Sequence, residues 1–324
     1  MTLRRNIHRN GAERMRKPHS LLAVLVLLLA QSCFTGVEST PKIGNAEVKQ
    51  KNAATQTAEQ LYLADIAPQP LKNWRPGKQF LITNPKIALI FQPNGATFNT
   101  ADTLIYKGLK EIPSPTGTAT NLLFTIGNNK DTVVYRLNDA PQTILSRPEL
   151  EVPFTIDLDL IESVAQRLAG NKYFVLTPRW NDAADNITTR LKYIPVRIIE
   201  VAPGNEEFPI KVKFQPESPH NPEGAVYSLY MTPTNNKHST RNFDNLFSIT
   251  DPRRKYPSIT DHVWDNIINN RIETGMTRDE VRLALGSPND VDRGHDYSSV
   301  YERWNYDGGI YLIFRDGLLE TFRR

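Results

Sequence analysis

The sequence predicts a multidomain, mainly β chain with a smaller α+β part: two small antiparallel barrels, then a domain of two helices and a three-stranded sheet (ααβββ). Three observations support this fold class. A pattern of short alternating strands occurs twice, helical spacing of apolar residues begins near Ser258, and 324 residues exceed one typical domain. Thirteen Phe, twelve Tyr and four Trp residues are enough to form the cores of such domains.

The N-terminal segment 1–32 has the pattern of a secretory signal peptide. A basic stretch ends at Lys17, and ten apolar residues follow at 21–30. As a helix those ten residues rise only about 15 Å, about half the hydrocarbon thickness of a bilayer, so we do not expect them to span it. A basic flank before a short apolar core is typical of an export signal. Met1 and Met15 both stay open as the start residue.

Cys33 is the single cysteine and follows the apolar core in the segment Ala30-Gln31-Ser32-Cys33. This segment resembles the lipobox of bacterial lipoproteins, although a lipobox usually has a large aliphatic residue in place of Ala30 and a small one in place of Gln31. The resemblance implies a lipid such as palmitate on Cys33. It also implies anchoring in the cell envelope, where we expect the outer membrane. The alternative is an ordinary signal peptide followed by an unmodified cysteine.

The segment 33–60 is small and polar, without sustained apolar periodicity, and is predicted to be a lipidated N-terminus followed by a flexible tether. The net charge of the whole chain is +4, but residues 1–32 contain six Lys or Arg and one Glu, which is +5 and leaves about −1 for the remainder. Because the basic excess lies in the targeting segment, the composition does not favour nucleic acid as a partner.

A diverged internal repeat follows the tether. The first copy opens with GKQFLIT at 77–83 and closes with TVVYRL at 132–137. The second copy opens with GNKYFVLT at 170–177 and closes with AVYSLYM at 225–231. Between these landmarks lie short strands with period-two alternation, separated by turns rich in Pro, Gly and Asn.

Each copy is predicted to form a small closed barrel, because an open sheet of this size would expose its edges. The pattern resembles Src-homology-3-like barrels. We expect the first barrel within 61–140, and a helix followed by the second barrel within 141–231. The helix is predicted at 157–170, where apolar residues recur at helical spacing.

The segment 232–257 returns to a polar, turn-forming composition and is predicted to be a linker. It contains a small apolar patch of Phe243, Leu246 and Phe247, and a basic run at 253–255. The basic run could contact anionic lipid or a partner, but the interpretation that we prefer is a solvated linker.

Residues 258–324 are predicted to form the ααβββ domain. Apolar residues from Ile259 to Ile268 have helical spacing, so one helix begins near Ser258. The strands are expected at 298–307, 310–316 and 318–324, because alternating aromatic and aliphatic residues are separated there by glycine turns.

The second helix of this domain has recognisable start and stop signals. Thr277 and Glu280 form the pattern of a capping box, in which each side chain accepts a hydrogen bond from the other residue's backbone N–H. Gly286 stands where a left-handed C-cap is needed, and Pro288 prevents the helix from continuing.

The motif within this region resembles the SmpA/OmlA domain, typified by BamE, a lipoprotein of the outer-membrane β-barrel assembly machinery. It consists of Gly275, Met276, Thr277, Val281, Leu285, Gly286 and Pro288. The strands that follow it, W-x-Y and Y-L-x-F-x-D-G-x-L, also match. The resemblance covers about one fifth of the chain and implies a binding module without naming its partner. A typical family member is little more than an anchored copy of this domain, whereas here two barrels precede it.

Motifs for catalysis are missing from the sequence. It has no G-x-S-x-G or H-E-x-x-H segment and no glycine-rich phosphate loop. We interpret Asp157 and Asp159 as solvated carboxylates near a helix start, and His262 and His295 as surface or capping residues. We therefore expect no enzyme activity, no metal site and no cofactor.

Two functions stay open at this point. The first is a membrane-anchored scaffold that binds envelope proteins, and the SmpA/OmlA resemblance implies a role in outer-membrane protein assembly or envelope integrity. The second is a peptidoglycan- or glycan-binding envelope protein, since small barrels of this type recur in proteins that contact peptidoglycan.

Overall fold

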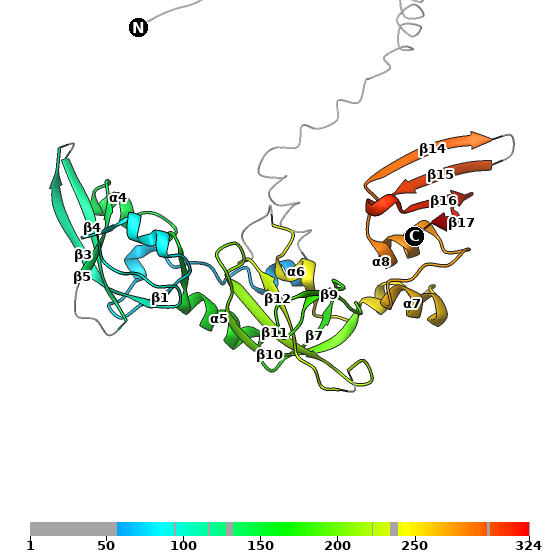
Figure 1. Cartoon of the computed structure of the whole chain (residues 1–324), viewed down its shortest axis with the longest axis horizontal. Coiled ribbons are helices and arrows are strands. Elements are labelled where there is room, and N and C mark those ends of the chain that lie inside the picture. The colour runs from blue at the N-terminus through cyan, green and yellow to red at the C-terminus, as the bar shows by residue number, and fades with distance from the viewer. Residues whose placement is uncertain are drawn as a thin grey trace, which may run out of the picture. The chain divides into compact units, whose positions relative to one another are not determined.

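The computed structural model describes residues 57–323 apart from 94, 116, 128–131, 222, 234–238, 297 and 298. Within this part the chain is mainly β, with three antiparallel sheets of six, seven and four strands and a few short helices (Figure 1). The prediction of a mainly β fold is confirmed. The predicted signal peptide, Cys33 and nearly all of the predicted tether lie outside the described residues.

The first β unit, residues 71–157, is a six-stranded sheet in the order β2-β5-β4-β3-β1-β6. A separate apolar cluster, which includes Phe80, Phe91 and Phe124, forms its core. Its elements are η1 (Leu71–Asn73), β1 (Gln79–Ile82), η2 (Pro85–Leu89), β2 (Phe91–Gln92), β3 (Thr103–Ser114), β4 (Gly117–Ile126), β5 (Thr132–Leu137), α4 (Pro141–Leu145) and β6 (Thr155–Asp157).

The second β unit, residues 158–248, is a seven-stranded sheet in the order β13-β7-β10-β11-β12-β8-β9. Helix α5 begins after Asp157, whose side chain accepts hydrogen bonds from the N–H groups of Asp159 and Leu160. The elements of this unit are α5 (Leu158–Leu168), β7 (Lys172–Val175), β8 (Arg179–Asn181), β9 (Ile187–Thr189), β10 (Ile194–Pro203), β11 (Ile210–Pro216), β12 (Tyr227–Met231), α6 (Phe243–Leu246) and β13 (Phe247–Ser248).

The two units share the order of their equivalent strands. Strands β1, β3, β4 and β5 neighbour one another as β7, β10, β11 and β12 do. The register of both long hairpins shifts at corresponding places, between Tyr106 and Gly108 and between Ile198 and Glu200. Gly77 and Gly170, both at positive φ, donate backbone hydrogen bonds of 2.8 Å to Tyr106 and Ile198. The two copies of the sequence repeat therefore share both their strand order and the position of the register shift in the long hairpin.

The edge strands differ from the sequence-based boundaries. Strand β6 lies in the segment expected to belong to the second barrel, yet it pairs with β1 of the first unit. Strand β13 lies in the expected linker 232–257, yet it pairs with β7 of the second unit. Such short strands have no periodicity of their own, so only long-range pairing reveals them.

The predicted linker and the end of the predicted tether contribute to the second core. Phe243, Leu246 and Phe247 are buried there, with exposed fractions of 0%, 4% and 0%. Helix α3 (Ala58–Tyr62), capped by Thr57, packs against α6. The segment 232–257 is therefore not simply a linker, because its three large apolar side chains form part of the core of the second β unit.

Residues 252–323 pack two helices against a four-stranded sheet. The apolar face of α7 and α8 meets the inner face of the sheet, where Trp304, Leu312 and Phe314 are fully buried. The elements are η3 (Pro252–Lys255), α7 (Asp261–Ile268), α8 (Arg278–Leu285), β14 (Asp290–Asp296), β15 (Ser299–Asn305), η4 (Asp307–Gly309), β16 (Tyr311–Arg315) and β17 (Leu318–Arg323). The sequence predicts three strands here and not β14, because the segment DVDRGHD is charged and has no apolar alternation.

Candidate binding groove

The residues of the SmpA/OmlA-like motif build the C-terminal fold rather than a site. Met276 and Val281 are buried in its core, and the capping box of Thr277 and Glu280 is present. The N–H of Gly275 donates a hydrogen bond to the carbonyl of Leu319 on β17, and the N–H of Leu319 donates one to the carbonyl of Met276, both at 2.8 Å. The motif thus fixes the start of α8 and its attachment to the sheet.

The end of α8 is equally specific. Gly286 has φ 87° and ψ −174°, a conformation that is essentially restricted to glycine. Leu285 packs at the edge of the same core, and Pro288 follows the cap. The two ends of α8 therefore explain why these residue types occur at this spacing.

Asp157 and Asp159 are not simply solvated, in contrast to the interpretation from sequence. The Nζ atom of Lys78 donates to both carboxylates at 2.7 Å, and its side chain is 2% exposed. Lys78 precedes β1, so these contacts join the first β unit to the start of α5. An ammonium group buried to this degree needs such partners.

The histidines of the C-terminal region take separate roles. His262 contacts Glu273, with 2.9 Å between Nε2 and Oε2, and His295 lies on β14 opposite Val300. His220 borders a cavity of about 350 Å³ near Trp180 and Tyr227. No group of three or more His, Cys, Asp or Glu residues suited to a metal ion occurs among the described residues.

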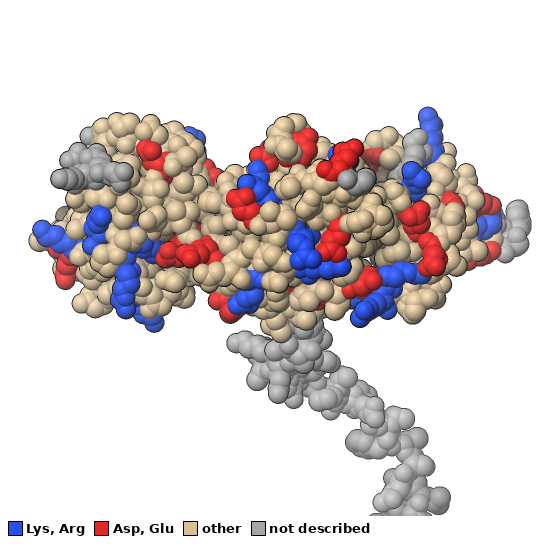
Figure 2. Space-filling model, turned by 90° about the horizontal axis from the view of Figure 1, so that it is seen from below, with Lys and Arg blue, Asp and Glu red and all other residues tan. Residues whose placement is uncertain are grey.

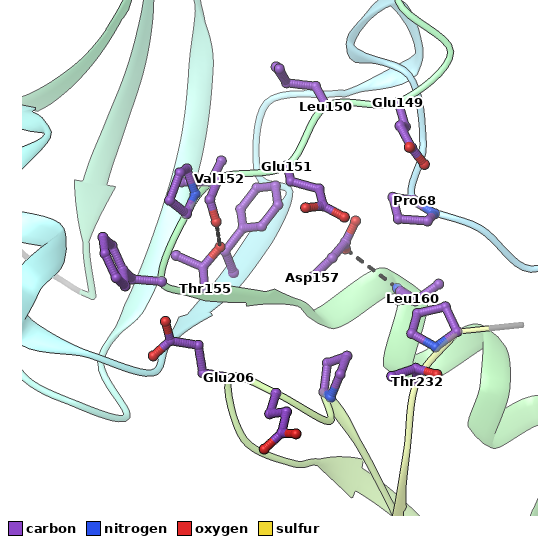
Figure 3. A pocket seen from close by; sticks show the side chains of 16 residues that line it. Pro68, Glu149, Leu150, Glu151, Val152, Thr155, Asp157, Leu160, Glu206 and Thr232 are labelled. Carbon is purple, nitrogen blue, oxygen red and sulfur yellow. Dashed lines mark hydrogen bonds between the residues drawn. The ribbon is translucent and has the colours of Figure 1, made fainter. Parts of the chain in front are cut away.

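A larger cavity, of about 670 Å³, lies where the two β units meet (Figure 3). We call it the groove. Its lining residues are Pro68, Phe80, Glu149, Leu150, Glu151, Val152, Pro153, Phe154, Thr155, Asp157, Leu160, Glu206, Glu207, Pro209, Thr232 and Pro233.

One wall of the groove is the segment 149–157, which ends in β6. A tight turn precedes this strand: Phe154 has φ 63°, and the hydroxyl of Thr155 donates to the carbonyl of Val152 at 2.8 Å. The backbone N–H of Thr83 donates to the carbonyl of Phe154, which extends the pairing of β1 with β6. This wall is therefore held by backbone hydrogen bonds.

The opposite wall is the hairpin between β10 and β11. The side chain of Asn205 accepts hydrogen bonds from the N–H groups of Glu207 at 3.1 Å and Phe208 at 2.8 Å, which fixes the turn. Gly204 has to be glycine, because a Cβ there would lie 2.2 Å from the carbonyl oxygen of Phe208. Glu206 and Glu207 consequently stand at the tip of a rigid hairpin.

The lining of the groove is acidic. Its described residues include five carboxylates and no Lys or Arg. Asp157 has Lys78 as its partner, whereas Glu149, Glu151, Glu206 and Glu207 form no ion pair with any described residue. Charges of both signs are interspersed on the face of the molecule in Figure 2, so charges of a single sign set the groove apart.

The second β unit contacts the C-terminal helices through the segment 190–193. The Nζ atom of Lys192 donates to the carbonyl of Ala284 at 2.7 Å, near the end of α8. Tyr193 stacks on Trp264, with ring centres 5.6 Å apart. Lys192 is 4% exposed, and burial lowers its pKa to about 8 because the charged form is desolvated.

Neither the groove nor the contact of Lys192 is predictable from the sequence. The groove draws on segments up to 165 residues apart, from Pro68 to Pro233. The local signals were the acidic pairs at 149 and 151 and at 206 and 207, each beside proline or asparagine turns. None of the described helices is both long and apolar enough to cross a membrane. Comparison with protein-family models, curated proteins and solved structures found no match.

Proposed function

We propose that this chain is a lipid-anchored protein of the cell envelope that binds other proteins and acts as a scaffold, with Cys33 as its anchor. The basic and apolar pattern of residues 1–32 and the position of Cys33 support export and lipidation. The resemblance of residues 258–324 to SmpA/OmlA domains supports the outer membrane as the location and assembly or envelope integrity as the process.

The observation that carries the binding function is the groove. Its surface combines apolar side chains with a charged rim, which is the composition of a protein-binding site. Its carboxylates come from both β units, with Glu151 and Asp157 in the first unit or at its end and Glu206 in the second.

We further propose that each β unit is a Src-homology-3-like barrel and that residues 258–324 form an SmpA/OmlA-like domain with β14 added at its edge. The shared strand order of the two units supports the first assignment. Two helices packed on one face of an antiparallel sheet support the second. Both assignments make the chain an array of binding modules.

Two experiments test the proposed function. Cys33→Ala should move the protein from the membrane fraction to the soluble fraction, and a variant that stays in the membrane would contradict the anchor assignment. A photo-crosslinking residue at Glu207 should capture a specific envelope protein in cells, whereas the same residue at the exposed Glu111 should not. Equal labelling at both positions would contradict a role for the groove in binding proteins.

A second candidate is binding of peptidoglycan or another glycan. The cavity of about 350 Å³ favours it, because Tyr227, His220 and the amide of Asn269 offer an aromatic ring and polar groups together. However, Arg190 covers the ring of Tyr227 at 4.9 Å, so a sugar would have to displace it. Cosedimentation with purified peptidoglycan tests this candidate, and loss of cosedimentation in Tyr227→Ala would support it.

A further inference from the structure

We propose that the groove binds an extended segment of a partner protein that carries Lys or Arg at alternating positions. This inference rests on the proposed protein-binding function and specifies the partner of that site. Three properties of the groove lead to it: a strand edge without a described neighbour, carboxylates on two walls that form no ion pair with a described residue, and an apolar lining.

The strand edge belongs to β6. Among the described residues this strand is the last of its sheet and pairs with β1 alone, so its other edge has no described strand beside it. Thr155 and Asp157 of β6 both line the groove. An extended peptide can add to such an edge through backbone hydrogen bonds, at about 4.8 Å from the existing strand.

The charge on the walls selects a basic partner. Glu149 and Glu151 stand beside β6, and Glu206 lies across the groove from them (Figure 3). Glu207 belongs to the same hairpin as Glu206. A single metal ion does not fit this distribution, because no group of three or more metal-binding residues occurs among those described. Several cations carried along one chain match carboxylates that lie on two walls.

The apolar lining of the groove is the reason why we expect basic and apolar residues to alternate in the partner segment. Among its lining residues Phe154, Pro209 and Pro233 are partly exposed, so they present apolar surface to a ligand. Successive side chains of a strand point to opposite faces. A segment whose Lys or Arg residues alternate with apolar residues can therefore place its apolar side chains against this lining and its basic side chains near the carboxylates.

The test uses the full chain in detergent micelles and a fluorescent peptide of about eight residues, a typical strand length, in which Lys and Val alternate. Fluorescence anisotropy should show saturable binding that weakens when NaCl rises from about 50 to about 300 mM. A peptide with Glu in place of Lys should not bind. A peptide N-methylated at alternate residues keeps its charge but cannot pair with β6, and it should bind at least about tenfold more weakly, which is about 1.4 kcal/mol.

Matched protein variants locate the site. Changing Glu149, Glu151, Glu206 and Glu207 together to Gln should weaken binding by about tenfold or more, since each screened charge pair contributes a few tenths of a kcal/mol. The control is Glu111→Gln with Glu223→Gln, two exposed carboxylates outside the groove. Unchanged binding in the fourfold variant, or equal binding of the N-methylated peptide or of free spermine, would overturn the inference.

Failure of this inference can be told apart from failure of the proposed function. If the peptide does not bind but Glu207 crosslinks a specific envelope protein, the scaffold function stands and the basic, extended partner is wrong. If the peptide binds as expected but Cys33→Ala stays in the membrane, the groove assignment stands and the anchor is wrong.

Discussion

Replacement of Lys192 by Met should change how stability depends on pH. The ammonium group of Lys192 is buried, and its pKa falls from 10.5 to about 8 on folding. Between these two values the unfolded chain binds more protons than the folded chain, so the free energy of unfolding rises with pH in this window. Below pH 8 both states are protonated, and the folded state carries the whole desolvation penalty, about 3 kcal/mol.

The difference between wild type and Lys192→Met isolates this effect. Between pH 7 and pH 9.5 the wild type should gain about 2 kcal/mol of stability relative to the variant. At pH 7 the variant should be slightly more stable, because the lost desolvation penalty exceeds the loss of one hydrogen bond to Ala284. Tyr193 lies beside Lys192 and has its pKa raised by burial to about 12. Its effect begins near pH 10, has the opposite sign and stays outside the measured range.

Urea unfolding followed by tryptophan fluorescence measures these differences at each pH. The control is Lys86→Met, because Lys86 is exposed and stays hydrated in both states. The difference between the control and the wild type should not vary with pH. A flat difference for Lys192→Met would refute the desolvation argument. A difference of opposite sign would mean that the carbonyl of Ala284 outweighs desolvation and favours the charged form.

Three further substitutions test the fold by the same unfolding assay. Trp304→Ala should lower stability by about 3–5 kcal/mol, because it empties a fully buried site, whereas Val300→Ala on the same strand should change it by less than about 0.5 kcal/mol. Lys78→Met should lower stability by about 2–3 kcal/mol, since it leaves a partly buried carboxylate pair without its cation, and adding Asp157→Asn should restore part of the loss. Gly286→Ala should lower stability by about 1–3 kcal/mol, and a change below about 0.5 kcal/mol would contradict the strained cap.

The sequence predicted those elements whose signals are local. The capping box at Thr277 is present, with Glu280 Oε2 accepting from the Thr277 N–H at 2.7 Å. Helix α5 spans Leu158–Leu168 within the predicted range 157–170. The inner four strands of each unit lie where the alternation of apolar residues indicated. In all these cases a few neighbouring residues determine the conformation.

The features that the sequence did not predict depend on long-range contacts. Strand β14 is charged along its length and is a strand only because it pairs with β15. Lys78 lies 79 residues from Asp157, and no local pattern relates the two. The groove needs both β units folded, since Glu151 and Glu206 come from different ones. Spacing along the chain carries no information about such pairs.

The repeat itself offers an internal control for the groove. The strand that corresponds to β6 in the second unit is β13, which pairs with β7 as β6 pairs with β1. In β13 both Phe247 and Ser248 are buried, at 0% and 3% exposed, and the hydroxyl of Ser248 donates to Glu59 of α3 at 3.0 Å. Helix α3 therefore occupies the region beside β13, whereas Thr155 and Asp157 of β6 line an open groove.

One unit thus covers the edge that the other leaves accessible, although their inner strands share one order. A sheet edge without a neighbour promotes uncontrolled pairing, so proteins usually cover it or block it with charge. In the first unit the edge of β6 is blocked by charge. It lies among carboxylates, which disfavour pairing with an acidic segment and favour pairing with a basic one. Removing these charges should therefore also raise nonspecific self-association. The variant that tests this changes four residues to Gln: Glu149, Glu151, Glu206 and Glu207. Sedimentation velocity of the fourfold variant measures this. If the variant stays as monodisperse as the wild type, the carboxylates do not prevent self-association through the edge of β6, and only their role in partner selection remains.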